Sequence, residues 1–108
     1  WLEKKISCYK IVRVPGIFEI PVVSAQEIEK SDGIIALGCV IKGKTPHFEF
    51  ISKSATDGIM NLSIQYKKPI GNGILTCLNK KQAEERSNTK KKNKGKDAAL
   101  ATLSLLNI

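Results

Sequence analysis

The sequence predicts a single α/β domain in which helices cover both faces of a parallel sheet, and three observations predict it. Apolar or β-branched runs alternate with segments of helical period, in the order strand, helix, strand, helix, strand, helix, with a further helix at the end. One run, Gly33–Ile41, is apolar throughout, which is typical of a parallel strand covered on both sides. The length of 108 residues allows one modest core, so residues 1–108 are expected to form one domain.

The first half of the chain contains two predicted helices around that buried strand, and an earlier strand. Tyr9–Val14 is short, rich in β-branched residues and closed by a Pro-Gly pair, so it predicts a strand. Ile20–Lys30 has proline in its first turn and apolar residues at helical spacing, which predicts a helix. Thr45–Lys68 predicts a longer helix with Thr45 as its N-cap.

The second half repeats the alternation. Pro69–Leu78 predicts a third strand, and Asn79–Ser87 predicts a helix with Asn79 as N-cap. A lysine-rich loop over Lys90–Lys96 leads to a last helix, Lys96–Leu106. The apolar spacing of that helix predicts an inward face of Ala98, Ala101 and Leu105.

Composition excludes several classes of protein. No apolar stretch approaches the about 20 residues of a membrane span, so no membrane association is expected. The net charge of +8 favours anionic partners, and Lys90–Lys96 holds five of the lysines. A solvated loop explains that run at least as well as a nucleic-acid patch, because the chain has few aromatic residues and arginines to support such a patch.

The cysteines and the single histidine exclude a metal centre. Cys8, Cys39 and Cys77 are odd in number and far apart, and His47 is the chain's one imidazole, so no zinc-ligand set exists and no metal is expected. Cys39 and Cys77 lie in apolar runs, which predicts buried free thiols. Free thiols favour a reducing, cytoplasmic location.

Three loops should meet beyond the carboxyl ends of the strands, where ligands gather in such folds. One of them leads into a helix whose first turn contains His47. The free N–H groups of a helix start favour a phosphate, and its positive end keeps an imidazole neutral near pH 7 and able to take a proton. A histidine that only caps or packs at the helix start is the alternative interpretation.

Five ordered motifs connect these loops to a known family. They are "VPGIFEIP" (Val14–Pro21), "LGCVIKGKTPHFEF" (Leu37–Phe50), "PIGNGILT" (Pro69–Thr76), "QAEER" (Gln82–Arg86) and "NKGKDAA" (Asn93–Ala99). Their combination resembles the 6,7-dimethyl-8-ribityllumazine synthase family. The resemblance implies a flavodoxin-like, three-layer αβα sandwich. It also implies an N-terminally truncated chain that lacks the family's first strand and most of its first helix, with "WLEKKISCYK" as the tail of that helix.

The resemblance implies a reaction as well. The family condenses 5-amino-6-(D-ribitylamino)uracil with 3,4-dihydroxy-2-butanone 4-phosphate in riboflavin biosynthesis, with loss of phosphate and two waters and without metal or organic cofactor. Such a chain is a cytoplasmic transferase that needs no cofactor.

Carried over by motif position, the site residues fall into three groups. Those implied for the ribitylaminouracil are Ile17, Phe18, Glu19, Cys39, Val40, Ile41, Asn72 and Lys94. Those implied for the butanone phosphate are Lys44, Thr45 and Arg86. His47 is the implied catalytic residue, which transfers a proton.

The resemblance also implies partners. Asn72, Arg86 and Lys94 would face the active site of a neighbouring subunit, so the expected assembly is a homo-oligomer, either a pentamer or a capsid of sixty subunits, with riboflavin synthase as a further partner. The chain differs from the family's usual pattern at Lys44, Asn72 and Lys92. At Asn72 it has an amide where many members have an aromatic ring.

Two other functions stay open from the sequence. A non-catalytic shell subunit would keep the fold and the assembly surfaces without turnover. A basic nucleic-acid-binding module is supported by the net charge alone.

Overall fold

The computed structural model describes residues 8–43, 47–88 and 93–106. The helices are α1 (Ile20–Glu27), α2 (His47–Tyr66), α3 (Lys80–Ser87) and α4 (Lys94–Leu105), and the strands are β1 (Ile34–Ile41) and β2 (Ile70–Cys77). Two short 3-10 helices, η2 (Ile17–Glu19) and η3 (Ile28–Lys30), flank α1. The parallel pairing of β1 with β2 and the alternation with helices confirm the predicted α/β class.

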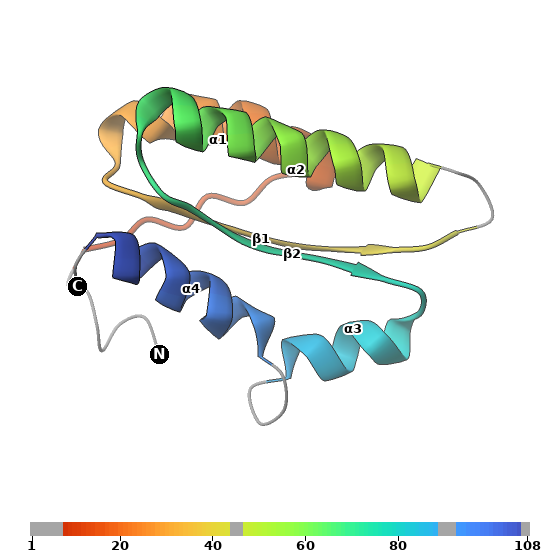
Figure 1. Ribbon diagram of the computed structural model, residues 1–108. Helices are drawn as coiled ribbons and strands as arrows, with labels where there is room; N and C mark the ends of the chain where they lie inside the picture. Colours follow the sequence, from red (N-terminus) through yellow and green to blue (C-terminus); the bar gives the residue numbers. More distant parts are fainter. Residues whose placement is uncertain (1–7, 44–46, 89–92, 107–108) are drawn as a thin grey trace.

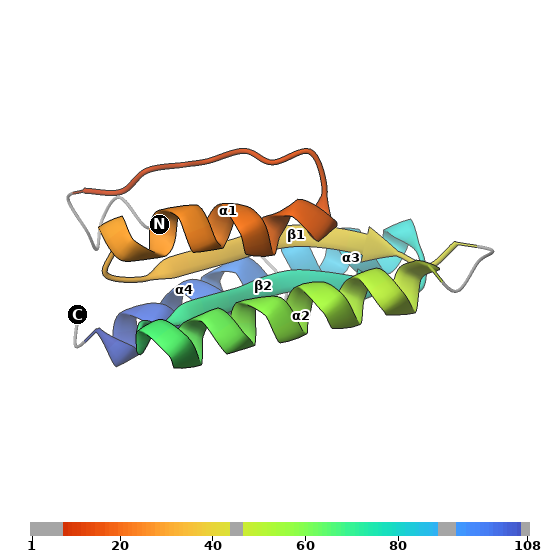
Figure 2. The ribbon, with the colours of Figure 1, turned by 90° about the horizontal axis from the view of Figure 1, so that it is seen from above.

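The elements form three layers. Figure 1 shows the sheet between α1 and α2 on one face and α3 and α4 on the other. Seen from above in Figure 2, α1 and α2 lie side by side across the sheet. Within the described ranges, no helix is long and apolar enough to cross a membrane.

The register of the sheet decides which backbone groups are free. Ile34 lies opposite Ile70, and its N–H donates to the carbonyl oxygen of Pro69 at 3.0 Å. At the other end, Lys42 N–H donates to the carbonyl oxygen of Cys77 at 2.8 Å. In a parallel ladder, alternate residues point their backbone groups to alternate sides. The even-numbered residues of β1 therefore face β2, and the odd-numbered ones face the outer edge.

The outer edge of β1 is open. Ile35, Leu37, Cys39 and Ile41 point their backbone N–H and C=O groups to this edge. In the part of the chain that the structure describes, no residue hydrogen-bonds to these backbone groups. Such a row of free N–H and C=O groups is a template for a further strand.

The core on the α1–α2 face is small and apolar. Its centre consists of the buried side chains of Ile20, Ala36 and Ile59. Partly buried residues that pack around this centre are Val14, Ile17, Ile70 and Ile74. This cluster joins α1, α2, η2 and both strands, so it fixes the entry into α1 against the sheet.

On the opposite face, α4 packs closely on β2. A Cβ added at Gly71 would collide with Thr102 Oγ1 and the carbonyl oxygen of Ala98, so glycine lets the helix approach this closely. The buried residues of α4 are Ala98, Ala99, Thr102 and Leu103. The predicted inward face is therefore wrong at Ala101, which is exposed, and at Leu105, which is 71% exposed. The residues of α4 that contact β2 at Gly71 are Ala98 and Thr102.

The strand predicted over Tyr9–Val14 is wrong. The segment has no strand ladder, and in the described ranges no backbone hydrogen bond joins it to β1. It runs alongside α1 (Figure 2), where Lys10 Nζ lies 3.4 Å from Glu27 Oε1. Its β-branched composition favours extended backbone, but a strand also needs a neighbour to pair with.

The prediction that Gly33–Ile41 is covered on both sides is also wrong. Leu37 is 59% exposed, Ile41 is 44% exposed, and the thiol of Cys39, expected to be buried, is exposed. The cause is the placement of α4, which packs mainly on β2. Cys77, on β2, is buried as predicted.

Two asparagines set the starts of the last helices. Asn79 Oδ1 accepts from Gln82 N–H at 2.9 Å, which confirms the predicted N-cap of α3. Asn93, with φ of 37°, caps α4 by accepting from Lys96 N–H at 3.2 Å. Lys94–Lys96 is therefore helical and not part of the predicted loop, because Asn93 tolerates the left-handed backbone that starts the helix early.

Candidate active site

The first candidate pocket lies where η2 meets the start of α2. Its volume is about 530 Å³, which is within the range of small-molecule sites. Its lining residues are Gly16, Ile17, Phe18, Glu19, His47, Phe50, Ile51 and Ser54. The pocket thus brings together four of the residues that the sequence singled out.

The η2 turn presents its side chains to this pocket. Glu19 N–H donates to the carbonyl oxygen of Gly16 at 3.3 Å, and a proline in the first turn of α1 favours the helix that follows at once. Ile17 is anchored because it packs on the core cluster. Phe18 is 66% exposed, so its ring is free to contact a ligand.

His47 is the first residue of α2 and is exposed. The helix position agrees with the sequence prediction of a histidine in the first turn. Phe50, Ile51 and Ser54 follow it at intervals of three, four and seven residues, which places all four on one helix face. This spacing is the signal by which the sequence could have found the three missed residues.

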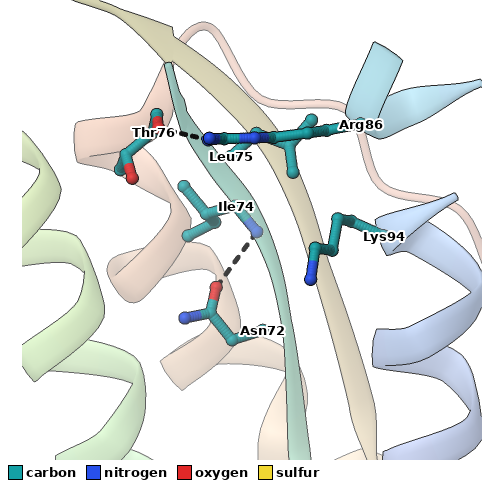
Figure 3. Close-up of a pocket in the computed structure, with 6 residues that line it drawn as sticks. All are labelled: Asn72, Ile74, Leu75, Thr76, Arg86 and Lys94. Carbon is teal, nitrogen blue, oxygen red and sulfur yellow. Dashed lines mark hydrogen bonds between the residues drawn. The ribbon is translucent and has the colours of Figure 1, made fainter. Parts of the chain in front are cut away.

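The second candidate pocket lies at the free edge of β2, between the strand and the ends of α3 and α4 (Figure 3). Its volume is about 500 Å³. Its lining residues are Asn72, Ile74, Leu75, Thr76, Arg86 and Lys94. Asn72, Arg86 and Lys94, which the sequence also singled out, therefore share one pocket.

Two cations dominate this second pocket. Arg86, in the last turn of α3, donates from Nη1 to the carbonyl oxygen of Thr76 at 2.9 Å and lies 3.8 Å from Cys77 Sγ. Lys94 opens α4, with its Nζ 3.9 Å from Asp97 Oδ2 in an exposed pair. Because none of the described residues that line the pocket is acidic, the arrangement suits an anion.

The strand contributes polar groups through alternate residues. Asn72 Oδ1 accepts from Ile74 N–H at 3.0 Å, which bends the amide back on its own strand. Asn72, Ile74 and Thr76 share a strand face because side chains alternate. Ile74, Leu75 and Thr76 were not predicted as site residues, although this alternation, counted from Asn72, points to two of them.

The remaining predicted site residues lie elsewhere. Cys39, Val40 and Ile41 end β1 and line neither pocket. Lys44 and Thr45 lie outside the described residues. The two pockets share no lining residue, so within the described ranges one chain does not gather all the predicted groups in one site.

Cys39 on β1 and Cys77 on β2 lie on adjacent strands, two residues apart in register. Partial burial, the nearby Cys77 and a hydrogen bond to its thiol all raise the pKa of Cys39 above its ordinary value. In the described ranges, no cluster of three or more His, Cys, Asp or Glu side chains could hold a metal ion.

Comparisons with known proteins agree on one family. The model of the family described as 6,7-dimethyl-8-ribityllumazine synthase matches residues 2–108. A 6,7-dimethyl-8-ribityllumazine synthase of Nitratidesulfovibrio vulgaris is 48% identical over 101 residues, which is 91% of this chain and 64% of that protein. One of Desulfovibrio desulfuricans is 46% identical over the same share of both chains. The chain thus spans less than two thirds of the length of these relatives.

Proposed function

The chain belongs to the 6,7-dimethyl-8-ribityllumazine synthase family, and from this membership we propose that it condenses 5-amino-6-(D-ribitylamino)uracil with 3,4-dihydroxy-2-butanone 4-phosphate to 6,7-dimethyl-8-ribityllumazine. The condensation releases phosphate and two waters and draws on no metal or organic cofactor. One observation supports the proposal: seven of the twelve residues that the family motifs single out line two pockets of ligand size.

The first pocket provides the groups for proton transfer and for a polyhydroxylated chain. The carboxylate of Glu19 accepts hydrogen bonds from ribityl hydroxyls, and the exposed ring of Phe18 covers the substrate. His47, exposed in the pocket wall at the start of α2, takes the proton that leaves as the new ring forms. The backbone of Cys39, Val40 and Ile41 hydrogen-bonds the pyrimidine.

The second pocket provides the phosphate clamp. The guanidinium of Arg86 is positioned by Thr76 and retains N–H groups for a bidentate contact with phosphate oxygens. Lys94 adds a second positive charge, and Asn72 completes the wall. From the family motifs, Lys44 and Thr45 are proposed to bind the same phosphate.

We further propose that the two pockets work together across subunits. The two share no lining residue, so a complete site takes the His47 pocket of one copy and the Arg86 pocket of another. Such a site needs a homo-oligomer, with a pentamer as the smallest form and a capsid as a larger one. Riboflavin synthase is the proposed further partner, and the free thiols suit a cytoplasmic location.

The direct test is turnover. The chain is mixed with both substrates, and lumazine formation and phosphate release are followed together. Equal amounts of lumazine and phosphate support the proposal. Oligomers of the expected size that release neither product would favour the non-catalytic shell subunit. Salt-sensitive nucleic-acid binding without turnover would favour the basic module.

A further inference from the structure

Arg86 makes a second contact behind the wall of the second pocket. Its Nη1, which donates to the carbonyl oxygen of Thr76 (Figure 3), also lies 3.8 Å from the Sγ of Cys77, a distance at which sulfur accepts a weak hydrogen bond. Cys77 is 0% exposed, whereas Arg86 is half-buried. The thiol therefore contacts the guanidinium from the interior, on a side that a ligand in the pocket does not reach.

The two contacts occupy both N–H groups of one guanidinium nitrogen. Nη1 carries two hydrogens and has two acceptors, the oxygen of Thr76 and the sulfur of Cys77. Among the residues that the structure describes, none accepts a hydrogen bond from Nη2 or Nε of Arg86. The edge formed by Nη2 and Nε is thus the one that can hold two phosphate oxygens in a fork.

The sulfur of Cys77 has a fixed place because the backbone around it is held. Its carbonyl oxygen accepts from Lys42 N–H at 2.8 Å, at the end of the pairing with β1. The next N–H, that of Leu78, donates to Gln82 Oε1 at 2.8 Å and joins the strand end to α3. A bond to Thr76 alone would let the guanidinium turn about that bond, whereas a second acceptor at a fixed place restricts this rotation.

This step rests on the proposed function: we infer that Cys77 is a positioning residue, whose buried thiol orients the guanidinium of Arg86 so that its Nη2–Nε edge meets the phosphate of the butanone substrate. Cys77 touches no substrate and acts through Arg86. A freely turning guanidinium loses rotational freedom when it binds, so its orientation in the free chain favours affinity. The effect falls on phosphate binding and not on turnover.

Three variants separate the acceptor from the packing of the side chain. Cys77→Ala removes the acceptor and leaves a gap, Cys77→Val removes the acceptor and fills the space, and Cys77→Ser keeps an acceptor. The Ala and Val variants should raise KM for the butanone phosphate about three- to tenfold, the usual contribution of one hydrogen bond, and should change kcat and KM for the uracil substrate by less than about twofold. Cys77→Ser should lie closer to the unaltered chain than either.

Ile59→Val is the control for lost stability. It removes one methyl group from the core cluster on the opposite face of the sheet, so it destabilises the fold without touching Arg86. Its KM for the butanone phosphate should stay within about twofold of that of the unaltered chain. Thermal unfolding shows how much stability each variant has lost.

A measurement without substrates reports on the guanidinium itself. The chain has two arginines, and the exposed Arg13 is an internal reference for Arg86. In nitrogen NMR spectra of the isotope-labelled chain, slow rotation about the Nε–Cζ bond separates the Nη1 and Nη2 signals, which fast rotation averages. Arg86 should rotate more slowly than Arg13 in the unaltered chain and in Cys77→Ser. In Cys77→Ala and Cys77→Val, its rotation should be faster by about threefold or more.

The outcomes distinguish this inference from the function on which it rests. If the unaltered chain shows no turnover, the proposed function fails, and NMR together with titration of inorganic phosphate still decides whether Cys77 positions Arg86. An Arg86 that rotates as fast as Arg13 in the unaltered chain would overturn the inference. Unaltered rotation or unaltered phosphate affinity in Cys77→Val would also overturn it and would assign Cys77 a packing role. If Cys77→Ala does not fold, the Val and Ser variants decide.

Discussion

Arg86 Nη1 lies 2.9 Å from the carbonyl oxygen of Thr76, so the end of α3 is tied to the free edge of β2. Nη1 makes this bond and a longer one to Cys77 Sγ at 3.8 Å, and in the described ranges Nη2 and Nε donate to no protein group. The two contacts restrict the rotation of the side chain. A tethered guanidinium loses little entropy when it binds an oxyanion.

We therefore expect Arg86→Ala to weaken the phosphate-bearing substrate. Loss of a charge-assisted bidentate pair should cost about 2–4 kcal/mol in kcat/KM for the butanone phosphate. Arg86→Lys should recover only part of it, because it keeps the charge and loses the fork. Kinetics with each substrate varied provide the measurement, and Lys81→Ala, on the exposed surface of α3, is the control. Equal effects of Lys81→Ala and Arg86→Ala on kcat/KM would show that the overall positive charge, and not a specific contact of Arg86, determines the affinity for the phosphate-bearing substrate.

For His47, the expected loss is in turnover and not in binding. His47→Ala should lower kcat roughly ten- to a thousandfold, the usual contribution of a general acid or base. The dissociation constant of the uracil substrate should change by less than about threefold, because the residue acts on a proton. Single-turnover rates and equilibrium titration measure the two quantities. A variant with unaltered kcat would show that His47 only begins the helix.

Two isoleucines on α2 provide a matched stability pair. Ile59 is 3% exposed and Ile64 is 66% exposed. Ile59→Ala should lower the free energy of unfolding by about 2–5 kcal/mol, because it empties space in the core cluster. Ile64→Ala should change it by less than about 0.5 kcal/mol. Urea unfolding followed by circular dichroism tests both, and similar midpoints would contradict the assigned core.

Two glycines test the contact between α4 and the sheet. Gly71→Ala should destabilise the fold by about 1–3 kcal/mol, since its Cβ would collide with Thr102 and Ala98. At Gly43 no described residue lies within 4 Å of an added Cβ, so Gly43→Ala should be close to neutral or slightly stabilising. Thermal unfolding of the two variants distinguishes them. A neutral Gly71→Ala would mean that α4 does not rest on β2.

The raised pKa of Cys39 should be visible in its reaction with iodoacetamide. The raised pKa leaves a smaller thiolate fraction at pH 8, so Cys39 should react more slowly in the folded chain than in the unfolded chain, and this difference in rate should narrow as the pH rises. The pKa of Cys39 is higher in the folded chain than in the unfolded chain. Its contribution to the stability of the fold is therefore fully present at low pH and is lost as the pH rises through the folded pKa. Peptide mapping by mass spectrometry follows each thiol, and the buried Cys77 should react only after unfolding.

The parts that the sequence predicted well depend on local patterns. Ile34–Ile41 is an apolar run whose composition favours a strand, and Asn79 caps a helix through its own side chain. Ile70–Cys77 combines apolar residues with two glycines, which predicted a strand that something approaches closely. The prediction of a strand over Tyr9–Val14 was wrong because a strand needs a neighbouring strand to pair with, and no local pattern specifies that neighbour. Cys39 was expected to be buried, but its exposure is decided by where α4 lies, and that depends on the glycine at position 71.

In the candidate site, too, the features set by local sequence could be predicted, whereas those set by tertiary packing could not. His47 could be placed at a helix start from local signals alone. That Asn72, Arg86 and Lys94 share a pocket could not be read from spacing, because it requires α3 and α4 to turn back beneath β2. The family motifs supplied those residues, while the orientation of the Asn72 amide came from one contact in the structure.

The two edges of the sheet differ in what they can join. On β2, Asn72 and Arg86 already occupy the N–H of Ile74 and the carbonyl oxygen of Thr76, whereas the outward row on β1 is untouched within the described ranges. Two molecules that each have one open sheet edge can pair these edges about a two-fold axis, and no open edge is then left in the pair. A fibre needs a second open edge on every molecule. Misassembly through the sheet should therefore stop at pairs.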